Sequence, residues 1–373
     1  MKRFGKITMY ILLGIIATIC VFVWLLSRSE QMGSLASGNA LKRMQTTGTY
    51  SEGAFQNLEL TPAFKEGVSR FTVFKSFFLG KDKRNVPSVP LPVDVTPIKQ
   101  LKRDENVLIW FGHSSYYLQV DGVRILVDPI FNQRASPVPG SIKAFATTYS
   151  YQVDDLPDQI DLLLLTHDHW DHLDYPTLKK LKGRVDRIVT GLGVGAHLER
   201  WGFDETKIDE LYWHESIQLG ALRVTSTPAR HFSGRWLKRN TSLWSSFVLE
   251  SPSKRLYVGG DSGYGTHFKE IGQQYGPFDL AILENGQYSE YWRYIHLMPE
   301  EAVQAANDLQ AQVLLPVHHS KFPLSNHAWD EPIIRLTNEA ARVGLPTWTP
   351  RLGQLVLFDQ ENQFETWWET VEE

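Results

Sequence analysis

Cysteine is almost absent from this sequence, since Cys20 is the only one among 373 residues. A single cysteine excludes an internal disulfide framework, and it excludes a metal site built from several thiolates. A surplus of basic residues is absent too, because 38 lysines and arginines stand against 42 aspartates and glutamates. Nucleic acid is therefore not expected as a partner. With 42% hydrophobic and 21% charged residues, and without a short repeat that would indicate a solenoid, the composition is that of a globular protein.

A long uncharged segment lies close to the N-terminus, ITMYILLGIIATICVFVWLL at residues 7–26. At 1.5 Å per residue, such a helix measures roughly 30 Å, the thickness of the hydrocarbon core of a bilayer. A cleaved signal peptide is the alternative, but its apolar region is normally only about 7–15 residues long. We therefore interpret residues 1–30 as a single-pass membrane anchor. Lys2, Arg3 and Lys6 precede the segment, so the positive-inside rule favours a cytoplasmic N-terminus and an extracytoplasmic body.

Residues 31–90 are expected to connect the anchor to the body of the protein. The first half of this segment is rich in Ser, Gly, Asn and Gln, as in a flexible tether. Residues 64–84 then interleave aromatic and basic side chains. This aromatic/basic strap either packs across the body with its lysines in water or lies on a membrane surface, and we favour packing across the body. Residues 91–373 are interpreted as one domain.

From residue 106 onward, hydrophobic runs recur at short intervals. Two of them, 115–120 and 123–128, flank Asp121-Gly122, which predicts a tight hairpin turn. Further strands are expected at 107–111, 161–166, 187–190, 221–227, 244–250, 254–260, 278–284, 311–317 and 353–358, and helices at 176–183, 196–202, 299–310 and 331–344. This mixture predicts a layered α/β body of roughly 270 residues, with two sheets covered by helices.

An abrupt change of polarity marks the end of one expected strand. The apolar run from Leu162 to Leu165 opens into THDHWDH, residues 166–172, which carries three histidines. Alternate positions of an extended backbone project to one side, and the turn that follows brings Asp171 and His172 back to the same place. Protonated imidazoles would repel one another there, whereas a divalent cation selects neutral imidazole and ionised carboxylate. The motif therefore predicts a metal site rather than a solvated surface loop.

Other expected strands also end in possible metal ligands. His231, Asp261, His318 and His319 each come just after such a strand. Each of them alone is weak evidence, because polar residues are common wherever a strand gives way to a turn. Together they are strong evidence, because turn chemistry does not require a residue of metal-binding type at every one of these positions.

Taken together, these motifs resemble those of the metallo-β-lactamase superfamily. The segments that carry the resemblance, in order, are WFGHSSYYLQVDGVRILVDPIF, THDHWDHLDY, TPARH, GDSGYG, GPFDLA, IHLMPEEAV and VHHSKF. Within the superfamily they are most similar to the branch of the N-acylphosphatidylethanolamine-hydrolysing phospholipases D. The resemblance implies an αββα sandwich with two zinc ions in a cleft at one edge of the sheets.

By the same resemblance, seven side chains are the expected ligands of two Zn²⁺ ions, or of other divalent metals in their place. One ion would be held by His167, His169 and His231, the other by Asp171, His172 and His318, with Asp261 as the bridge. Each ion then keeps an open position, as a catalytic site requires. The adjacent His319 is expected to point away from the metals. The remaining histidines, His197, His214, His267 and His327, are expected to be ordinary core or surface residues.

Two closely spaced cations lower the pKa of water and polarise a phosphoryl or acyl oxygen. We expect Asp171 to orient the attacking water. His296 matches a histidine that lies near the scissile phosphate in the related branch, so we expect it to stabilise charge or to assist the leaving oxygen, with a packing or capping role as the alternative. His113, Tyr288 and Lys321 are candidates for substrate binding, although a structural role is favoured for His113.

The sequence departs from the related branch close to these candidates. Glu284-Asn285-Gly286-Gln287 precede Tyr288, where the branch has an apolar strand end. A charged Glu284 either changes the head group that the cleft accepts or pairs with Lys321.

These observations favour a metal-dependent phosphodiesterase of phospholipase D type, acting on N-acylphosphatidylethanolamine or a related amphiphilic lipid. The alternative is a hydrolase of a soluble ester, lactone, amide or cyclic phosphodiester on the same metal site. A di-iron redox enzyme is disfavoured, because such a site usually takes a carboxylate where this chain has His169. A non-catalytic scaffold is disfavoured as well, because all seven expected ligands are present.

Overall fold

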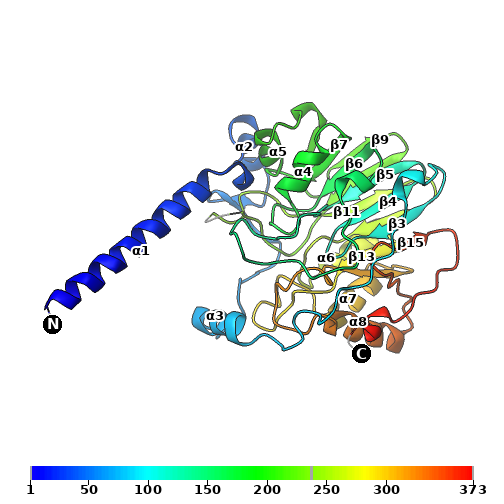
Figure 1. Ribbon diagram of the computed structural model, residues 1–373. Helices are drawn as coiled ribbons and strands as arrows, with labels where there is room; N and C mark the ends of the chain where they lie inside the picture. Colours follow the sequence, from blue (N-terminus) through cyan, green and yellow to red (C-terminus); the bar gives the residue numbers. More distant parts are fainter. Residues whose placement is uncertain (1, 236–237, 372–373) are drawn as a thin grey trace.

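The computed structural model describes residues 2–235 and 238–371, and its body is a sandwich of two β-sheets with helices on both outer faces (Figure 1). The first sheet holds, in spatial order, β15 (Leu355–Leu357), β3 (Val107–Trp110), β4 (Tyr116–Val120), β5 (Val123–Val127), β6 (Ile160–Leu165), β7 (Val185–Gly191) and β8 (Ile208–Leu211). The second holds β14 (Leu314–Val317), β13 (Leu280–Glu284), β12 (Arg255–Val258), β11 (Ser246–Glu250), β10 (Leu222–Thr227) and β9 (Ser216–Leu219). The αββα architecture expected from the sequence is confirmed.

Five helices flank the sheets, namely α4 (Tyr175–Leu181), α5 (Gly195–Arg200), α6 (His267–Tyr275), α7 (Pro299–Asp308) and α8 (Glu331–Val343). Short 3₁₀ turns lie at Glu30–Met32, Ile98–Gln100, Val153–Asp155, Glu205–Lys207 and Trp367–Thr370. Local sequence accounts for the helix ends. A proline opens α4, α7 and α8, where a missing N–H costs nothing, and α8 ends at Gly344, which has the left-handed conformation typical of that position.

The predicted hairpin is present between β4 and β5. The two strands pair antiparallel with Val120 opposite Val123, so Asp121 and Gly122 form a two-residue loop. The φ angles of these two residues are 47° and 79°. A type I′ turn needs positive φ at both central positions, which is why Asp-Gly is a preferred sequence for it.

Hydrophobic packing follows the alternation of side chains along the strands. On β6, Leu164 points into the cluster between the two sheets, where it joins Ile282 of the second sheet. Its neighbour Leu163 points the other way and packs with Leu178 of α4. The outer face of the second sheet is covered in the same manner by α6, α7 and α8, with Leu283 in the cluster between them. A strand buried on both faces reads as a continuous apolar run, which explains the sequence of β6.

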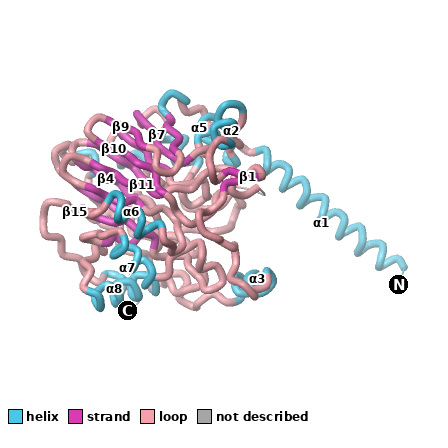
Figure 2. Tube along the Cα trace, turned by 180° about the vertical axis from the view of Figure 1, so that it is seen from behind, coloured by secondary structure: helices cyan, strands magenta, loops and turns pink. Residues whose placement is uncertain are grey.

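The apolar N-terminal segment forms one long helix, α1 (Lys2–Arg28), which projects away from the body (Figures 1 and 2). The stretch Lys6–Arg28 is long and apolar enough to cross a membrane, and it is almost entirely exposed. A helix of this length and composition at this place agrees with the predicted anchor. The side of the membrane that the body occupies stays a prediction.

The segment expected to be a loose tether instead packs on the body over much of its length. It contains α2 (Gly38–Gln45) and a small hairpin of β1 (Tyr50–Ser51) and β2 (Ala54–Phe55). Met44 and Phe55 are buried in a cluster with tryptophans of the body, at 1% and 0% exposure. Because the segment is mostly polar, its composition did not predict these two apolar contacts.

The aromatic/basic strap forms a helix, α3 (Arg70–Leu79), beside the body. One face packs as favoured, because Val73 contacts Trp292 and Ile295. The opposite face is exposed to solvent, with Phe71 at 75% exposure and Leu79 at 78%. Packing across the body is therefore observed for one face of the strap, and contact of its exposed face with a membrane stays a prediction.

Candidate metal centre

The histidine-rich motif forms the loop that joins β6 to α4. Its backbone turns back on itself, since the amides of His172 and Leu173 both donate to the carbonyl of His169. Asp174 closes the loop by accepting from the amide of Thr177 at the start of α4. This turn brings His172 back beside His167, with ring centroids 4.2 Å apart, as the spacing predicted.

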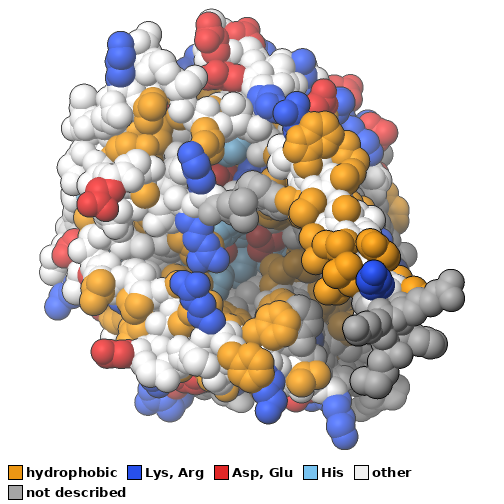
Figure 3. All heavy atoms as spheres, turned by 90° about the vertical axis from the view of Figure 1, so that its left-hand side faces the viewer, with side chains coloured by type: hydrophobic (Ala, Val, Ile, Leu, Met, Phe, Trp, Pro, Cys, Tyr) orange, Lys and Arg blue, Asp and Glu red, His pale blue; other side chains and the backbone are white. Residues whose placement is uncertain are grey.

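Residues from other strand ends converge on this loop. β12, β13 and β14 are parallel neighbours, so the side chains that follow their carboxyl ends meet at one edge of the sheet. Asp261, Glu284 and His318 stand at these three ends, and His231 follows β10. Figure 3 shows histidine and acidic side chains at the bottom of a hollow, with basic side chains along one side and hydrophobic ones on the other.

The first cluster contains three imidazoles and one carboxylate. Nδ1 of His169 lies 2.8 Å from Nε2 of His167 and 3.2 Å from Nε2 of His231. Oδ2 of Asp261 lies 3.8 Å and 3.6 Å from the same two Nε2 atoms. Nitrogen ligands about 2.0–2.1 Å from a tetrahedral Zn²⁺ stand roughly 3.3–3.4 Å apart, so this spacing fits one ion.

The second cluster contains His113, Asp171, His172 and His318, whose ligand atoms lie within 4.8 Å of one another. Asp261 approaches it as well, because its Oδ1 lies 3.2 Å from Nε2 of His172 and 3.1 Å from Nδ1 of His318. One carboxylate thus directs one oxygen to each cluster. The resemblance implies a bridging role for Asp261, and this role stays a prediction.

Hydrogen bonds on the far side of two rings fix which nitrogen faces the centre. Nδ1 of His231 donates to the carbonyl of Ile295 at 2.7 Å, and Nδ1 of His172 donates to Oδ2 of Asp128 at 2.8 Å. A neutral imidazole whose Nδ1 carries the hydrogen presents the lone pair of Nε2. Lone pairs and carboxylate oxygens that face one another in a buried space repel, and a cation between them removes the repulsion. The residues therefore fit a metal.

Burial keeps most of these imidazoles neutral. It lowers the pKa of four of them, to about 4 for His169 and well below the ordinary value for His167, His231 and His318. Neighbouring imidazoles lower the pKa values of these rings further. At pH 7 these side chains are unprotonated at the nitrogen that a metal binds.

His172 differs from the other imidazoles. Burial lowers its pKa, but the carboxylates of Asp261 and Asp171 outweigh burial and hold the pKa well above its ordinary value. Burial in turn raises the pKa of Asp261 to about 6. Without a cation, His172 is therefore the group that supplies positive charge to this cluster.

His113 fixes the position of Asp171. Its Nε2 lies 2.9 Å from Oδ2 of Asp171, and its ring is fully buried at 0% exposure. It belongs to the second cluster but does not line the cavity, and its contact with Asp171 agrees with the structural role favoured for it.

The metal cluster opens into a cavity of about 280 Å³. His169, Asp171, His231, Asp261, His296 and His318 form its floor, and Phe64, Val73, Phe77, Phe232, Trp292 and Ile295 are among the apolar residues of its walls. Two of these wall residues, Val73 and Phe77, belong to α3. The strap thus forms one wall of the metal cleft, a role that its sequence did not reveal.

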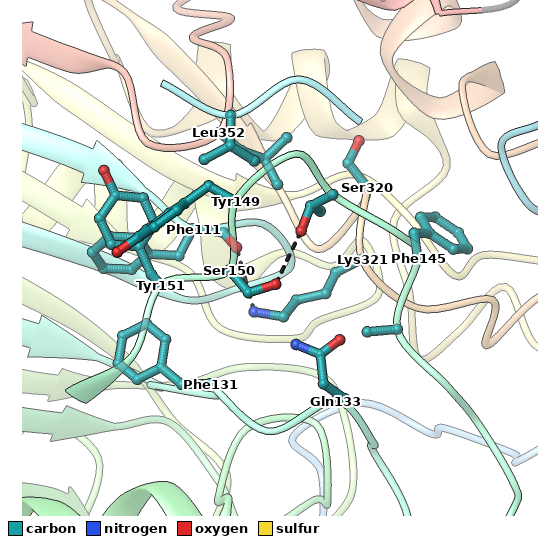
Figure 4. A pocket seen from close by; sticks show the side chains of 13 residues that line it. Phe111, Phe131, Gln133, Phe145, Tyr149, Ser150, Tyr151, Ser320, Lys321 and Leu352 are labelled. Carbon is teal, nitrogen blue, oxygen red and sulfur yellow. Dashed lines mark hydrogen bonds between the residues drawn. The ribbon is translucent and has the colours of Figure 1, made fainter. Parts of the chain in front are cut away.

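Tyr288 and Lys321, two candidates for substrate binding, are not brought into this cavity. The hydroxyl of Tyr288 donates to Glu331 at 2.8 Å, and Tyr288 lines a different pocket beside α8. Lys321 lines a separate pocket among aromatic side chains, shown in Figure 4, and its Nζ donates to the carbonyl of Ile130 at 2.6 Å. Burial lowers the pKa of Lys321 to about 8. The chain bends after His318, and Lys321 is not among the residues that line the metal cavity.

Glu284 does not pair with Lys321, because its partner is His296. Oε2 of Glu284 lies 2.6 Å from Nδ1 of His296. Burial raises the pKa of Glu284 well above its ordinary value and lowers the pKa of His296, so the pair avoids a net charge. In the sequence, Glu284 stands at the end of an expected strand, just as Asp261 and His318 follow the neighbouring strands. This shared position was the sequence signal that Glu284 lies near the site.

The other histidines lie outside the two clusters, as expected. Nδ1 of His319 contacts the hydroxyl of Ser320 at 2.7 Å, and its ring packs on Trp110. Nε2 of His197 contacts Asp168 at 3.3 Å. The remaining three have polar contacts elsewhere, His214 with Tyr275, His267 with Ser262 and His327 with the amide of Gln287.

Comparisons with known proteins show which family this chain resembles. Residues 123–319 match the family model described as a β-lactamase superfamily domain. An uncharacterised protein of Mycobacterium tuberculosis is 38% identical over 326 residues, which cover 86% of this chain and 87% of that protein. The N-acyl-phosphatidylethanolamine-hydrolyzing phospholipase D 1 of Caenorhabditis elegans is 30% identical over 279 residues, covering 68% of this chain and 76% of the relative. Among solved structures, the metallo hydrolase Igni18 of Ignicoccus hospitalis is similar in fold, with a TM-score of 0.53 and 22% identity over 69% of this chain and all of that protein.

Proposed function

Because the chain belongs to the metallo-β-lactamase superfamily, in the branch of the N-acylphosphatidylethanolamine-hydrolysing phospholipases D, we propose that this metal-dependent hydrolase is a dinuclear zinc phosphodiesterase that acts on a phospholipid. The observation that carries the proposal is the double cluster around Asp261, whose two oxygens face two different sets of imidazoles. One cation in each set, with Asp261 between them, would give each of the seven expected ligands a cation to bind.

Two Zn²⁺ ions are the proposed cofactors, although other divalent metals suit the same ligands. His167, His169 and His231 would hold one ion, Asp171, His172 and His318 the other, and Asp261 would touch both. Imidazole and carboxylate without thiolate is an ordinary ligand set for catalytic zinc. When bound, such a pair of cations makes water reactive at neutral pH and polarises a phosphoryl oxygen.

The residues of this chain then divide the remaining tasks. Asp171, fixed by His113, lines the cavity and is proposed to orient the attacking water. The oxygen of this water forms a bond to phosphorus while the bond from phosphorus to the head-group oxygen breaks. His296 lines the same cavity and is proposed to supply the proton that the leaving oxygen takes up. The products are a phosphomonoester and a free alcohol, which for N-acylphosphatidylethanolamine are phosphatidic acid and N-acylethanolamine.

A lipid substrate is supported by the walls of the cleft. The metal cavity shares Phe64, Val73 and Phe77 with a larger groove of about 960 Å³ along α3. Arg70 and Arg239 also line this groove, which places positive charge beside apolar surface. Such a surface suits the acyl chains and the phosphate of one amphiphilic molecule.

The membrane is the proposed partner of the same region. α1 and α3 project from the same side of the body, and the hollow with the histidines opens on that side (Figures 1 and 3). An anchor through α1 would hold the cleft near the bilayer, and the exposed Phe71 and Leu79 of α3 would enter its interface. Because Lys2, Arg3 and Lys6 precede α1, the body is proposed to face away from the cytoplasm.

The test uses the full-length protein in detergent after reconstitution with zinc. We expect about two equivalents of metal per chain, hydrolysis of N-acylphosphatidylethanolamine in mixed micelles, and loss of both in Asp261→Asn. The exposed Asp104→Asn serves as the matched control. Faster hydrolysis of soluble esters, lactones or cyclic phosphodiesters than of any micellar lipid would contradict the lipid assignment and favour the soluble-substrate alternative. The lipid profile of cells carrying the wild type or Asp261→Asn gives an independent check.

A further inference from the structure

Glu284 is a buried carboxyl group at the carboxyl end of β13, with 1% exposure. Burying such a group is costly unless every polar atom finds a partner. Its Oε1 accepts from the amide of Ser262 at 2.6 Å and from the amide of Leu297 at 3.4 Å. With one oxygen held by backbone, the other oxygen has a fixed direction, and that direction is toward His296.

The contact with Glu284 also fixes the orientation of the His296 ring. Oε2 and Nδ1 are 2.6 Å apart, which commits Nδ1 to Glu284 and leaves Nε2 as the nitrogen available to the cavity. The loop that carries His296 packs closely against Gly263. A Cβ on Gly263 would lie 2.1 Å from the carbonyl oxygen of Tyr294, so only glycine permits this approach.

We propose that Glu284 is a positioning residue for His296 and that the two act as one proton-donating pair on the leaving oxygen. The inference rests on the proposed function. The 2.6 Å between Oε2 and Nδ1 places one hydrogen between these two atoms, and the proton to be donated is assigned to Nε2, which faces the cavity. A carboxylate behind an imidazole is a general device for fixing its orientation and the nitrogen that reacts.

The proton transfer balances within this pair. When the bond between phosphorus and the head-group oxygen breaks, that oxygen takes the hydrogen of Nε2, and the proton shared with Glu284 settles on Nδ1. His296 remains neutral and Glu284 becomes a carboxylate. One proton from solvent then restores the pair, replacing the proton that the attacking water has released. No oxidant, reductant or further reactant is required.

A competing arrangement places a cation between Glu284, His296, Asp261 and His318, whose ligand atoms also lie within 4.8 Å of one another. It predicts that removing Glu284 lowers the metal content. The proton-donating pair predicts that metal content is unchanged, so the two arrangements differ in a direct measurement.

The experiment compares Glu284→Gln, His296→Asn and the double variant in the full-length, zinc-loaded protein. Glu250→Gln is the control, because Glu250 also ends a strand of the same sheet but pairs with Arg255 away from the cleft. Each protein is given two phosphodiesters that differ only in the leaving group, an alkyl alcohol or 4-nitrophenol. An alkoxide needs a proton to leave, whereas 4-nitrophenolate does not.

With the alkyl substrate, we expect Glu284→Gln and His296→Asn each to lower kcat by roughly 10²–10³-fold. With the nitrophenyl substrate, both variants should keep a rate near that of the wild type. The double variant should be no slower than His296→Asn, because Glu284 acts only through His296. An unchanged alkyl rate in Glu284→Gln, equal losses on both substrates, multiplied losses in the double variant, or a lower zinc content would each overturn the proposal.

A spectroscopic measurement keeps this test separate from the proposed activity. In protein with ¹⁵N-labelled histidine, the proton between Nδ1 and Glu284 should give a strongly downfield resonance that is absent from His296→Asn and Glu284→Gln. If the wild type hydrolyses neither phosphodiester, the proposed function fails, and the resonance alone decides whether the pair exists. A resonance that survives in Glu284→Gln overturns the pair.

Discussion

Asp128 accepts a hydrogen bond of 2.8 Å from Nδ1 of His172. The same carboxylate accepts from the amide and the hydroxyl of Thr166, the first residue of the histidine-rich loop. Asp128 follows β5, which is the parallel neighbour of β6. Its hydrogen bonds therefore connect the end of β5 to both Thr166 and His172 of the loop that follows β6. The loop is therefore held in shape before a metal binds.

We expect Asp128→Asn to weaken metal binding by about 10–100-fold, the usual effect of removing a carboxylate behind a histidine ligand. The amide oxygen can still accept a hydrogen bond, but it no longer offers the charge that supports the ring. Zinc affinity against a competing chelator measures the effect, and Asp104→Asn is the exposed control. Equal affinity in both variants would show that Asp128 does not act on the metal ligands.

The sequence predicted the parts of the fold and site that depend on local pattern. The Asp121-Gly122 turn, the apolar run of β6 and the H-x-H-x-D-H spacing each have one dominant structural solution. His231, Asp261 and His318 were predictable for a similar reason, since strand ends in an α/β sandwich gather at one edge and a metal explains why their residue types agree. Their roles as ligands stay predictions until metal is measured.

Other features depend on contacts between distant segments, which a single sequence does not specify. Met44 and Phe55 are isolated apolar residues in a polar stretch, and only the tertiary structure shows that they pack on the body. Tyr288 and Lys321 are near site residues in the sequence, but the chain turns between them and the metals. The partner of Glu284 also depended on which loop crosses the end of β13.

The two cation sites should differ in their pH dependence. The first site presents imidazoles that are already neutral, because burial lowers the pKa of His169 to about 4 and that of His167 well below its ordinary value. At the second site, the pKa of His172 is held well above its ordinary value, against the effect of burial, by Asp261 and Asp171. A cation there must displace a proton from Nε2, so a higher pH favours the cation.

Between pH 7 and 8, we therefore expect the affinity of the second cation to rise by up to about tenfold per pH unit, while that of the first stays nearly constant. Stepwise titration with zinc against chelators at several pH values measures both affinities. Parallel slopes for the two cations would contradict the assignment of the displaced proton to His172.

Apolar side chains on the exposed face of α3 should affect kcat/KM only when the substrate is in a bilayer. Phe71 and Leu79 are 75% and 78% exposed. Moving such a side chain from water into an apolar layer is worth about 1.5–3 kcal/mol. We expect Phe71→Ser with Leu79→Ser to lower kcat/KM on vesicles by about tenfold and to leave the rate on short-chain soluble substrates unchanged.

Val343→Ser is the control for this measurement, because Val343 is also exposed, at 42%, but lies at the end of α8. An equal loss on vesicles and on soluble substrates would mean that the serines disturb the wall of the cleft. No loss on vesicles would exclude α3 from the contact with lipid.

Gly263 should be essential for the placement of His296 although it does not touch the substrate. A Cβ at this position would lie 2.1 Å from the carbonyl oxygen of Tyr294 and 2.9 Å from the amide nitrogen of Ile295, both backbone atoms that cannot rotate away. The loop would have to move by several tenths of an ångström or more, which loosens the contact of His296 with Glu284. The carbonyl of Ile295 also accepts the hydrogen bond from His231, so a shift of the loop would displace His231 in the first cluster as well.

We expect Gly263→Ala to fold and to bind zinc with reduced affinity, and to lose at least tenfold in kcat, because catalytic groups displaced by about 1 Å lose much of their effect. Gly48→Ala is the matched control, since a Cβ there meets no atom within 4 Å. Kinetics with the alkyl and nitrophenyl phosphodiesters separate two origins of the loss. A displaced His296 lowers mainly the alkyl rate, whereas a disturbed metal cluster lowers both rates together. Wild-type kinetics on both substrates would mean that the loop tolerates the methyl group and that its close seating on Gly263 has no part in catalysis.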